Sequence, residues 1–169
     1  MERILCPIKN TQSDAVVMNY AIALARERNT ELVFFHATAI PFSVWKNPLV
    51  ENPLLIPGGF SWGFANWIEG ERTRTRRFIA MNYGAQLNGL RWRAEVEIGK
   101  PTREIVDIAY REEARLIVMT RGEKLWPLSL ISGVKAEQVS RMAPCPVVTV
   151  LPHQIANSWA GRSFSVALR

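Results

Sequence analysis

Short apolar runs alternate with longer amphipathic segments along most of this 169-residue chain. The short runs predict five strands, at residues 2–9, 31–40, 91–99, 115–121 and 146–152. Apolar positions that recur every three or four residues predict helices at 14–29, from 67 to about 88, at 101–114 and at 133–143. Because parallel neighbours need crossover connections, this alternation predicts an α/β fold, a single doubly wound domain with a five-stranded parallel sheet.

Two segments fall outside that alternation. Residues 41–67 combine four prolines with many aromatic residues, which predicts a long loop or lid within a domain spanning 1–152. Its tryptophans, Trp45, Trp62 and Trp67, are a candidate surface for a protein partner or a roof over the chain's own core, and both readings stay open. Residues 153–169 form a C-terminal tail that is either frayed or a partner-clasping arm.

Local signals mark where two of the helices begin. Thr11 and Asp14 have the T-x-x-D spacing of a capping box directly after the first strand. Pro101, which follows Gly99, suits the first turn of a helix. Ligands of doubly wound sheets bind beyond the carboxyl ends of the strands, so the loop that contains Thr11 is a candidate site.

The formal charge of +6 favours anionic partners only weakly. The densest basic stretch holds Arg72, Arg74, Arg76 and Arg77, which form either a solvated helix face or a patch for an acidic partner. No aromatic stacking motif accompanies them, so we expect no nucleic-acid partner. Neither a secretory leader nor a run of about 18 apolar residues is found, so we expect a cytoplasmic protein without membrane association.

The cysteines and histidines give no sign of catalysis or metal binding. Cys6 and Cys145 lie far apart in apolar stretches, which is typical of reduced, buried thiols. His36 and His153 have no neighbouring ligands at zinc spacing. No arrangement of nucleophile, base and acid is found, and we therefore expect a protein that is not an enzyme, with weak ATPase activity left open.

Three segments resemble successive hallmarks of the universal stress protein (UspA-like) family. They read ILCPIKNTQSD, EIGKPTREIVDIAYREEARLIVM and RMAPCPVVTV, and the resemblance spans residues 3–151. It implies an adenine nucleotide alpha hydrolase-like sheet of strand order 3-2-1-4-5, with a site between the loops after Ile8 and Met119. It also implies a homodimer joined through the last strand, 146–151.

Many members of this family bind ATP or AMP through a glycine pattern that is degraded in this chain. The pattern is Gly, two residues, Gly, nine residues, then Gly followed by Ser or Thr. Gly133 matches the last glycine, but Val134 follows it, and Gly122 supplies at most one of the first two. A carboxylate such as Glu123 there would repel phosphate. Lys9 stands where nucleotide-binding relatives carry an Asp, so that contact is also changed.

Two hypotheses of function follow. The first is a non-enzymatic stress-response dimer that has lost ordinary ATP binding, carries no cofactor and works through protein partners. The second is a nucleotide (ATP or AMP) or small-anion sensor with an altered site. Its candidate residues are Lys9, Thr11, Thr120, Gly122, Lys124 and Gly133. Lys9 would bind an anion in the second hypothesis, whereas a salt bridge or a solvated side chain suits the first.

Overall fold

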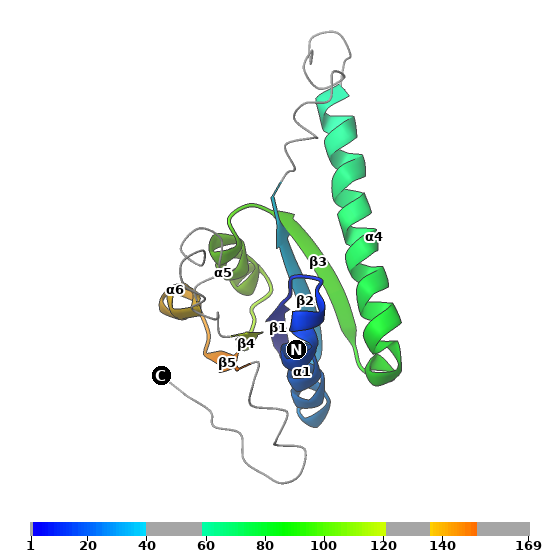
Figure 1. Cartoon of the computed structure of the whole chain (residues 1–169). Helices are drawn as coiled ribbons and strands as arrows, with labels where there is room; N and C mark the ends of the chain where they lie inside the picture. The colour runs from blue at the N-terminus through cyan, green and yellow to red at the C-terminus, as the bar shows by residue number, and fades with distance from the viewer. Residues whose placement is uncertain (1, 40–58, 121–135, 152–169) are drawn as a thin grey trace.

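The sheet has the parallel strands predicted from the sequence pattern and the strand order implied by the family resemblance. The computed structural model describes residues 2–39, 59–120 and 136–151, with side chains described from residue 65 onward in the second range. Its strands are β1 Arg3–Pro7, β2 Glu31–Thr38, β3 Trp92–Ile98, β4 Leu116–Thr120 and β5 Val147–Val150. They form one sheet in the order β3-β2-β1-β4-β5, and every pair is parallel (Figure 1). The predicted doubly wound α/β sheet is therefore confirmed.

Helices cover both faces of this sheet. They are α1 Ala15–Glu27, preceded by the short 3-10 helix η1 Gln12–Asp14, then α4 Gly59–Leu87, α5 Pro101–Arg111 and α6 Ala136–Met142. One core cluster joins α1 and α4 to alternate strand residues such as Ile4 and Cys6. The other joins α5 and α6 to the intervening residues, such as Leu5 and Val33. Because successive side chains of a strand point to opposite faces of the sheet, the protein has two separate cores, one on each face.

The prediction of a long loop at residues 41–67 was wrong for residues 59–67. Helix α4 already begins at Gly59, so 59–67 are helical, while 40–58 lie outside the described residues. The last proline of the segment is Pro57, so every residue from 58 to 67 has a backbone N–H. Aromatic residues reduce helix propensity only by about 0.5 kcal/mol each, so the backbone can be helical from Gly59 onward. Trp62 and Trp67 therefore belong to α4 rather than to a loop.

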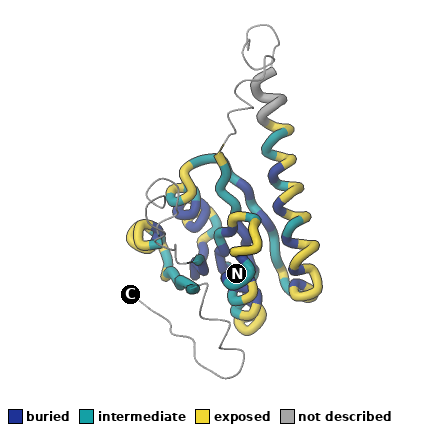
Figure 2. The backbone as a smooth tube through the Cα atoms, viewed as in Figure 1, coloured by how far each residue is buried: buried dark blue, intermediate teal, exposed yellow. Residues whose placement is uncertain are grey.

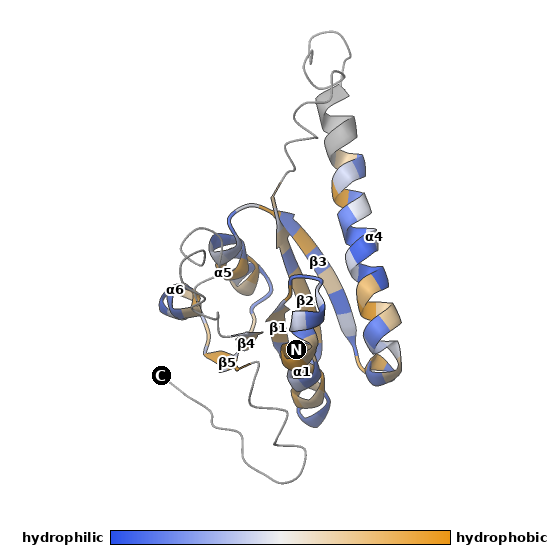
Figure 3. Cartoon of the chain, in the orientation of Figure 1, coloured by the Kyte–Doolittle hydropathy of each residue, from blue (hydrophilic) through white to orange (hydrophobic). Residues whose placement is uncertain are grey.

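Helix α4 is longer than the sheet that it covers. Its 29 residues extend about 43 Å, whereas the seven residues of β3 extend about 23 Å. In Figure 1 its N-terminal half projects past the carboxyl ends of β2 and β3. Every fourth residue faces inward, and these residues change from polar to apolar along the helix: Glu71, Thr75, Ile79, Tyr83 and Leu87. The apolar end packs in the core, while the polar end lies at the sheet's carboxyl edge (Figures 2 and 3).

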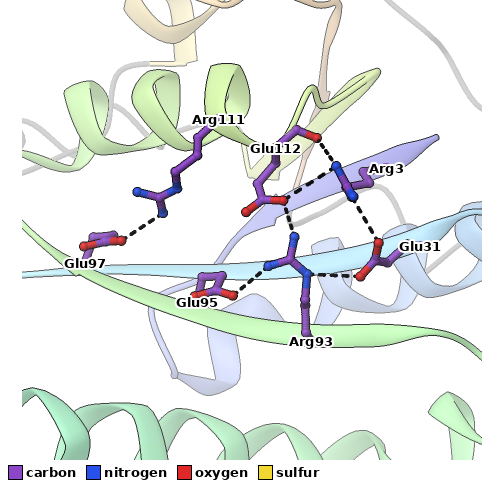
Figure 4. Close-up of polar contacts among 7 residues, drawn as sticks. All are labelled: Arg3, Glu31, Arg93, Glu95, Glu97, Arg111 and Glu112. Carbon is purple, nitrogen blue, oxygen red and sulfur yellow. Dashed lines mark hydrogen bonds and ion pairs between the residues drawn. The ribbon is translucent and has the colours of Figure 1, made fainter. Parts of the chain in front are cut away.

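On the α5 side of the sheet, β3 carries charges instead of apolar residues. The Arg93 guanidinium donates to Glu31 at 3.0 Å and to Glu95 at 2.6 Å, and it also pairs with Glu112 at the end of α5. Arg3 donates to the same Glu31 at 3.1 Å, so the network links three strands to α5 (Figure 4). Since β3 is an edge strand that α5 leaves largely uncovered, paired charges occupy positions that would otherwise expose apolar surface.

Both cysteines are free, as the sequence predicted, but the predicted burial is confirmed only for Cys6, because Cys145 is half-buried. Burial raises the pKa of the Cys6 thiol, and Asp14 nearby raises it further. Burial also raises the pKa of Cys145. Thiols with raised pKa values are poor nucleophiles, so neither cysteine is prepared for chemistry.

Candidate functional site

The strand order reverses between β1 and β4, and the loops that leave these two strands define the expected site. The loop after β1 is described throughout. The loop after β4 is not: Gly122, Lys124 and Gly133, with Glu123 and Val134, lie outside the described residues. Thr120 ends β4, is half-buried and pairs with Val150 of β5. The observable part of the site is therefore the β1 loop and what packs on it.

The β1 loop closes around a buried carboxylate. Asp14 is only 3% exposed, and its Oδ2 accepts hydrogen bonds from the backbone N–H groups of Lys9 and Thr11, both at 2.9 Å. The predicted capping box of Thr11 and Asp14 is present at the start of η1. The Lys9 and Thr11 side chains are exposed beside it, so the structure brings these two predicted residues together.

This arrangement limits what the β1 loop can bind. Backbone N–H groups that converge at a helix start are the usual donors to a phosphate or another anion. Here two of them already donate to the internal carboxylate of Asp14. An incoming phosphate would have to displace Asp14 or approach it against like charge. The Lys9 ammonium is the exposed cation of this loop, and no ion pair joins it to a carboxylate among the described residues.

Helix α4 contributes a polar contact that the sequence analysis did not identify. Asn10 has a left-handed backbone, with φ of 59°, and its Nδ2 donates to Thr75 Oγ1 at 2.8 Å. Thr75 is fully buried, and the Asn10 Oδ1 atom is buried with no hydrogen-bond partner among the described residues. Glu71, one helical turn before Thr75, is also buried and pairs with exposed Arg74. The inward stripe of α4, continued backward from Ile79 in steps of four, was the sequence signal for these polar groups.

His36 fixes the other side of the loop. The Ile8 backbone N–H donates to the Phe35 carbonyl at 2.8 Å, and the Ile8 carbonyl lies 3.1 Å from His36 Nδ1. Because a carbonyl only accepts, His36 Nδ1 carries the proton and donates. Its role in this contact is to hold the backbone of the β1 loop.

Neither a metal centre nor a membrane span is found in the described part of the chain. Among residues 2–39, 65–120 and 136–151, no group of three or more His, Cys, Asp or Glu side chains could hold a metal ion. None of the helices described is both long and apolar enough to cross a bilayer. The described site thus offers one exposed cation, hydroxyl groups and amides, but no activated nucleophile.

Comparisons with known proteins agree with the fold. The model of the universal stress protein family matches residues 63–150, which is more than half of the chain. Universal stress protein MJ0531 of Methanocaldococcus jannaschii is 25% identical over 153 residues, covering 88% of this chain and 81% of that protein. The solved structure of hypothetical protein MJ0577 has a TM-score of 0.63 at 20% identity, covering 89% of this chain and 95% of that one. A universal stress protein solved in complex with cAMP gives 0.53 at 16% identity, with coverage of 88% and 96%.

Proposed function

The chain belongs to the universal stress protein family, and from that premise we propose that it is a non-enzymatic stress-response protein acting through protein contacts. In this proposal its switch point has lost ordinary ATP binding, and the protein needs no cofactor. We further propose that it acts in the cytoplasm as a homodimer.

The observation that supports lost ATP binding most directly is that N–H groups of the β1 loop are already hydrogen-bonded within the protein. Asp14 accepts hydrogen bonds from the backbone N–H groups of Lys9 and Thr11. In addition, Lys9 presents an ammonium where nucleotide-binding relatives carry an acceptor carboxylate. An ammonium has three donors and no acceptor, so it cannot accept a hydrogen bond from a nucleoside as a carboxylate can. The valine at position 134 adds a second change, on the loop after β4.

Nucleotide content after purification tests this proposal. The protein is purified without added nucleotide, denatured, and the released small molecules are identified by mass spectrometry. Its thermal unfolding is then followed with and without millimolar ATP or AMP. We expect no retained nucleotide and no shift in the unfolding temperature, since a ligand that binds the folded state must raise it. Stoichiometric ATP or AMP in the purified protein would overturn the proposal.

The second candidate is an altered nucleotide or small-anion sensor. Two observations favour it: the exposed ammonium of Lys9, and the buried Asn10 Oδ1 atom, which lacks a hydrogen-bond partner among the described residues. The relative solved with cAMP shows that a protein of this fold can hold an adenine nucleotide. In this candidate Lys9, Thr11 and Thr120, with Gly122, Lys124 and Gly133, hold the anion. A concentration-dependent stabilisation by AMP, cAMP or inorganic phosphate, abolished by Lys9→Ala, would favour the sensor.

The outer edge of β5 supports the dimer. All four residues of β5 are half-buried, including Val147, Val148 and Val150, and β4 pairs with it on one side. An apolar edge strand invites pairing with a second copy. Light scattering after gel filtration should give twice the mass of one chain, and a monomer at micromolar concentration would contradict this part of the proposal.

The tryptophan-rich segment stays a second candidate for partner contacts, although Trp45 and the side chain of Trp62 lie outside the described residues.

A further inference from the structure

The side of α4 that faces away from the sheet carries a concentrated positive charge. Arg72, Arg74, Arg76 and Arg77 lie within six residues, and we call them the α4 basic face. Arg76 and Arg77 are exposed, and the Arg74 side chain is 72% exposed. Figure 2 shows exposed residues along this side of the helix, and Figure 3 shows that the middle of α4 is largely hydrophilic.

The charges of the α4 basic face are only partly balanced. Arg72 pairs with Glu69 at 3.5 Å, and Arg74 pairs with Glu71. For Arg76 and Arg77, the described residues provide no carboxylate within ion-pair distance. Four arginines against two glutamates leave a charge of +2 on residues 65–87. On the opposite side of β3 the contrast is clear, because Arg93 and Arg111 both pair with carboxylates (Figure 4).

Two glycines lie on either side of the α4 basic face, and no contact within the described chain requires a glycine at either position. Gly70 and Gly84 each lie seven residues from Arg77, so all three share one face. A Cβ atom added at either glycine would meet nothing within 4 Å, although glycine inside a helix costs about 1 kcal/mol relative to alanine. Small residues on an outward face allow another helix to approach closely. Met81, 73% exposed on the same side, adds apolar contact area.

We propose that the α4 basic face docks an acidic helix of a protein partner, with the partner's carboxylates at Arg76 and Arg77 and its backbone over Gly70 and Gly84. This inference rests on the proposed function, because it names the surface and the partner class for a protein that acts through contacts. Rim charges of this kind guide association and specificity more than they add affinity.

Charge and shape favour this occupant over others. A second α4 packed on the same face would bring like charges together. An anionic membrane would need an apolar helix face to insert, but the apolar side of α4, with Ile79 and Leu87, is buried against the sheet. A nucleic acid would use the arginines but would gain nothing from the open glycine positions.

The test uses the full-length protein and a defined probe. The probe is a labelled synthetic helix of about 20 residues, with glutamates flanking an alanine and leucine stripe. Its binding is followed by fluorescence anisotropy at low and at high ionic strength. Duplex DNA and vesicles containing anionic lipid are measured alongside. Variant R76E/R77E reverses the unpaired charges, and G70L/G84L fills the open positions. The control R103E/R141E makes the same change in net charge at exposed residues of α5 and α6.

We expect the probe to bind more weakly by about tenfold or more in R76E/R77E and also in G70L/G84L, while R103E/R141E binds like the unchanged protein. Circular dichroism and thermal unfolding confirm that each variant is folded. Several results would overturn the proposal: no binding of the peptide, equal losses in all three variants, or no loss in G70L/G84L. Binding of DNA or vesicles in place of the peptide would do the same. A nucleotide found in the purified protein would refute the proposed function but leave this peptide result unaffected.

Discussion

At the scale of single residues, the β1 loop depends on a small set of buried polar contacts. Asn10 keeps a left-handed backbone that is uncommon for residues other than glycine. Among the described residues, its side-chain amide donates one hydrogen bond, to Thr75 of α4. Asp14 holds two further N–H groups of the loop. These contacts fix the loop in the form that leaves little donor capacity for an anion.

Removing the Thr75 hydroxyl should therefore destabilise the fold. Thr75→Val keeps the size of the side chain but leaves the Asn10 amide without its acceptor. We expect a loss of about 1–2 kcal/mol in the free energy of unfolding, measured by urea denaturation. The matched control is Thr73→Val, an exposed position on the same helix, where the change should stay within about 0.5 kcal/mol. Equal effects at the two positions would contradict the role given to Thr75.

The network around Arg93 should make stability depend on pH. Burial alone raises the pKa of Glu31, but hydrogen bonds from Arg3 and Arg93 outweigh it and hold that pKa below its ordinary value of 4.5. A carboxyl group with a lowered pKa in the folded state stabilises the protein above pH 4.5, and this contribution is lost as the pH falls further.

Arg93→Met should consequently cost about 1–3 kcal/mol at neutral pH, because Glu31, Glu95 and Glu112 lose a shared donor. The cost should shrink below pH 4.5, as Glu31 becomes protonated in both proteins. Denaturant unfolding across that range measures the difference. Arg103→Met is the control, since its ion pair with Asp107 is exposed and should contribute less than about 0.5 kcal/mol. A cost that stays constant with pH would contradict the role of Glu31.

Sequence reasoning identified some of these residues and missed others for a physical reason. The capping box of Thr11 and Asp14 is a local pattern, and it could be predicted from three-residue spacing. The contact between Asn10 and Thr75 joins residues 65 positions apart. It exists because α4 continues beyond the sheet edge, which no local pattern around Asn10 indicates.

At the scale of elements, α4 combines an inward stripe that stabilises the fold with an outward face that does not. Gly70→Ala and Gly84→Ala should each raise the free energy of unfolding by up to about 1 kcal/mol, because alanine favours the helix and its Cβ meets nothing. Thermal unfolding measures this. Gly89→Ala is the opposite case: its φ is +75°, so alanine there should destabilise the protein by about 1 kcal/mol. A loss of stability at Gly70 or Gly84 would show that those positions are not open.

Elements with strong periodicity were predicted well, and boundaries near prolines and aromatics were not. The strands and α1 follow from short apolar runs and a regular apolar stripe. The start of α4 was predicted too late, because aromatic residues next to Gly58 and Gly59 resemble a loop when the packing is unknown. Helix α5 begins at Pro101, as its position after Gly99 predicted.

At the scale of the whole molecule, the parallel sheet follows from the alternation of elements, while the strand order came from the family resemblance. The order β3-β2-β1-β4-β5 confirms that expectation. Periodicity cannot give such an order, because it depends on which strands pair after the chain has folded. For the candidate site, the structure describes the β1 loop. The residues predicted on the loop after β4, Gly122, Lys124 and Gly133, lie outside the described residues.

The central claim is that the switch point of this chain does not take ATP in the usual manner, and isothermal titration with ATP tests it most directly. The unchanged protein is titrated beside the double variant K9D/V134S, which restores the acceptor carboxylate and the hydroxyl of the family pattern. We predict no measurable heat of binding for the unchanged protein up to millimolar ATP. Saturable binding of ATP to the unchanged protein at micromolar concentration would contradict the account, whatever the double variant binds.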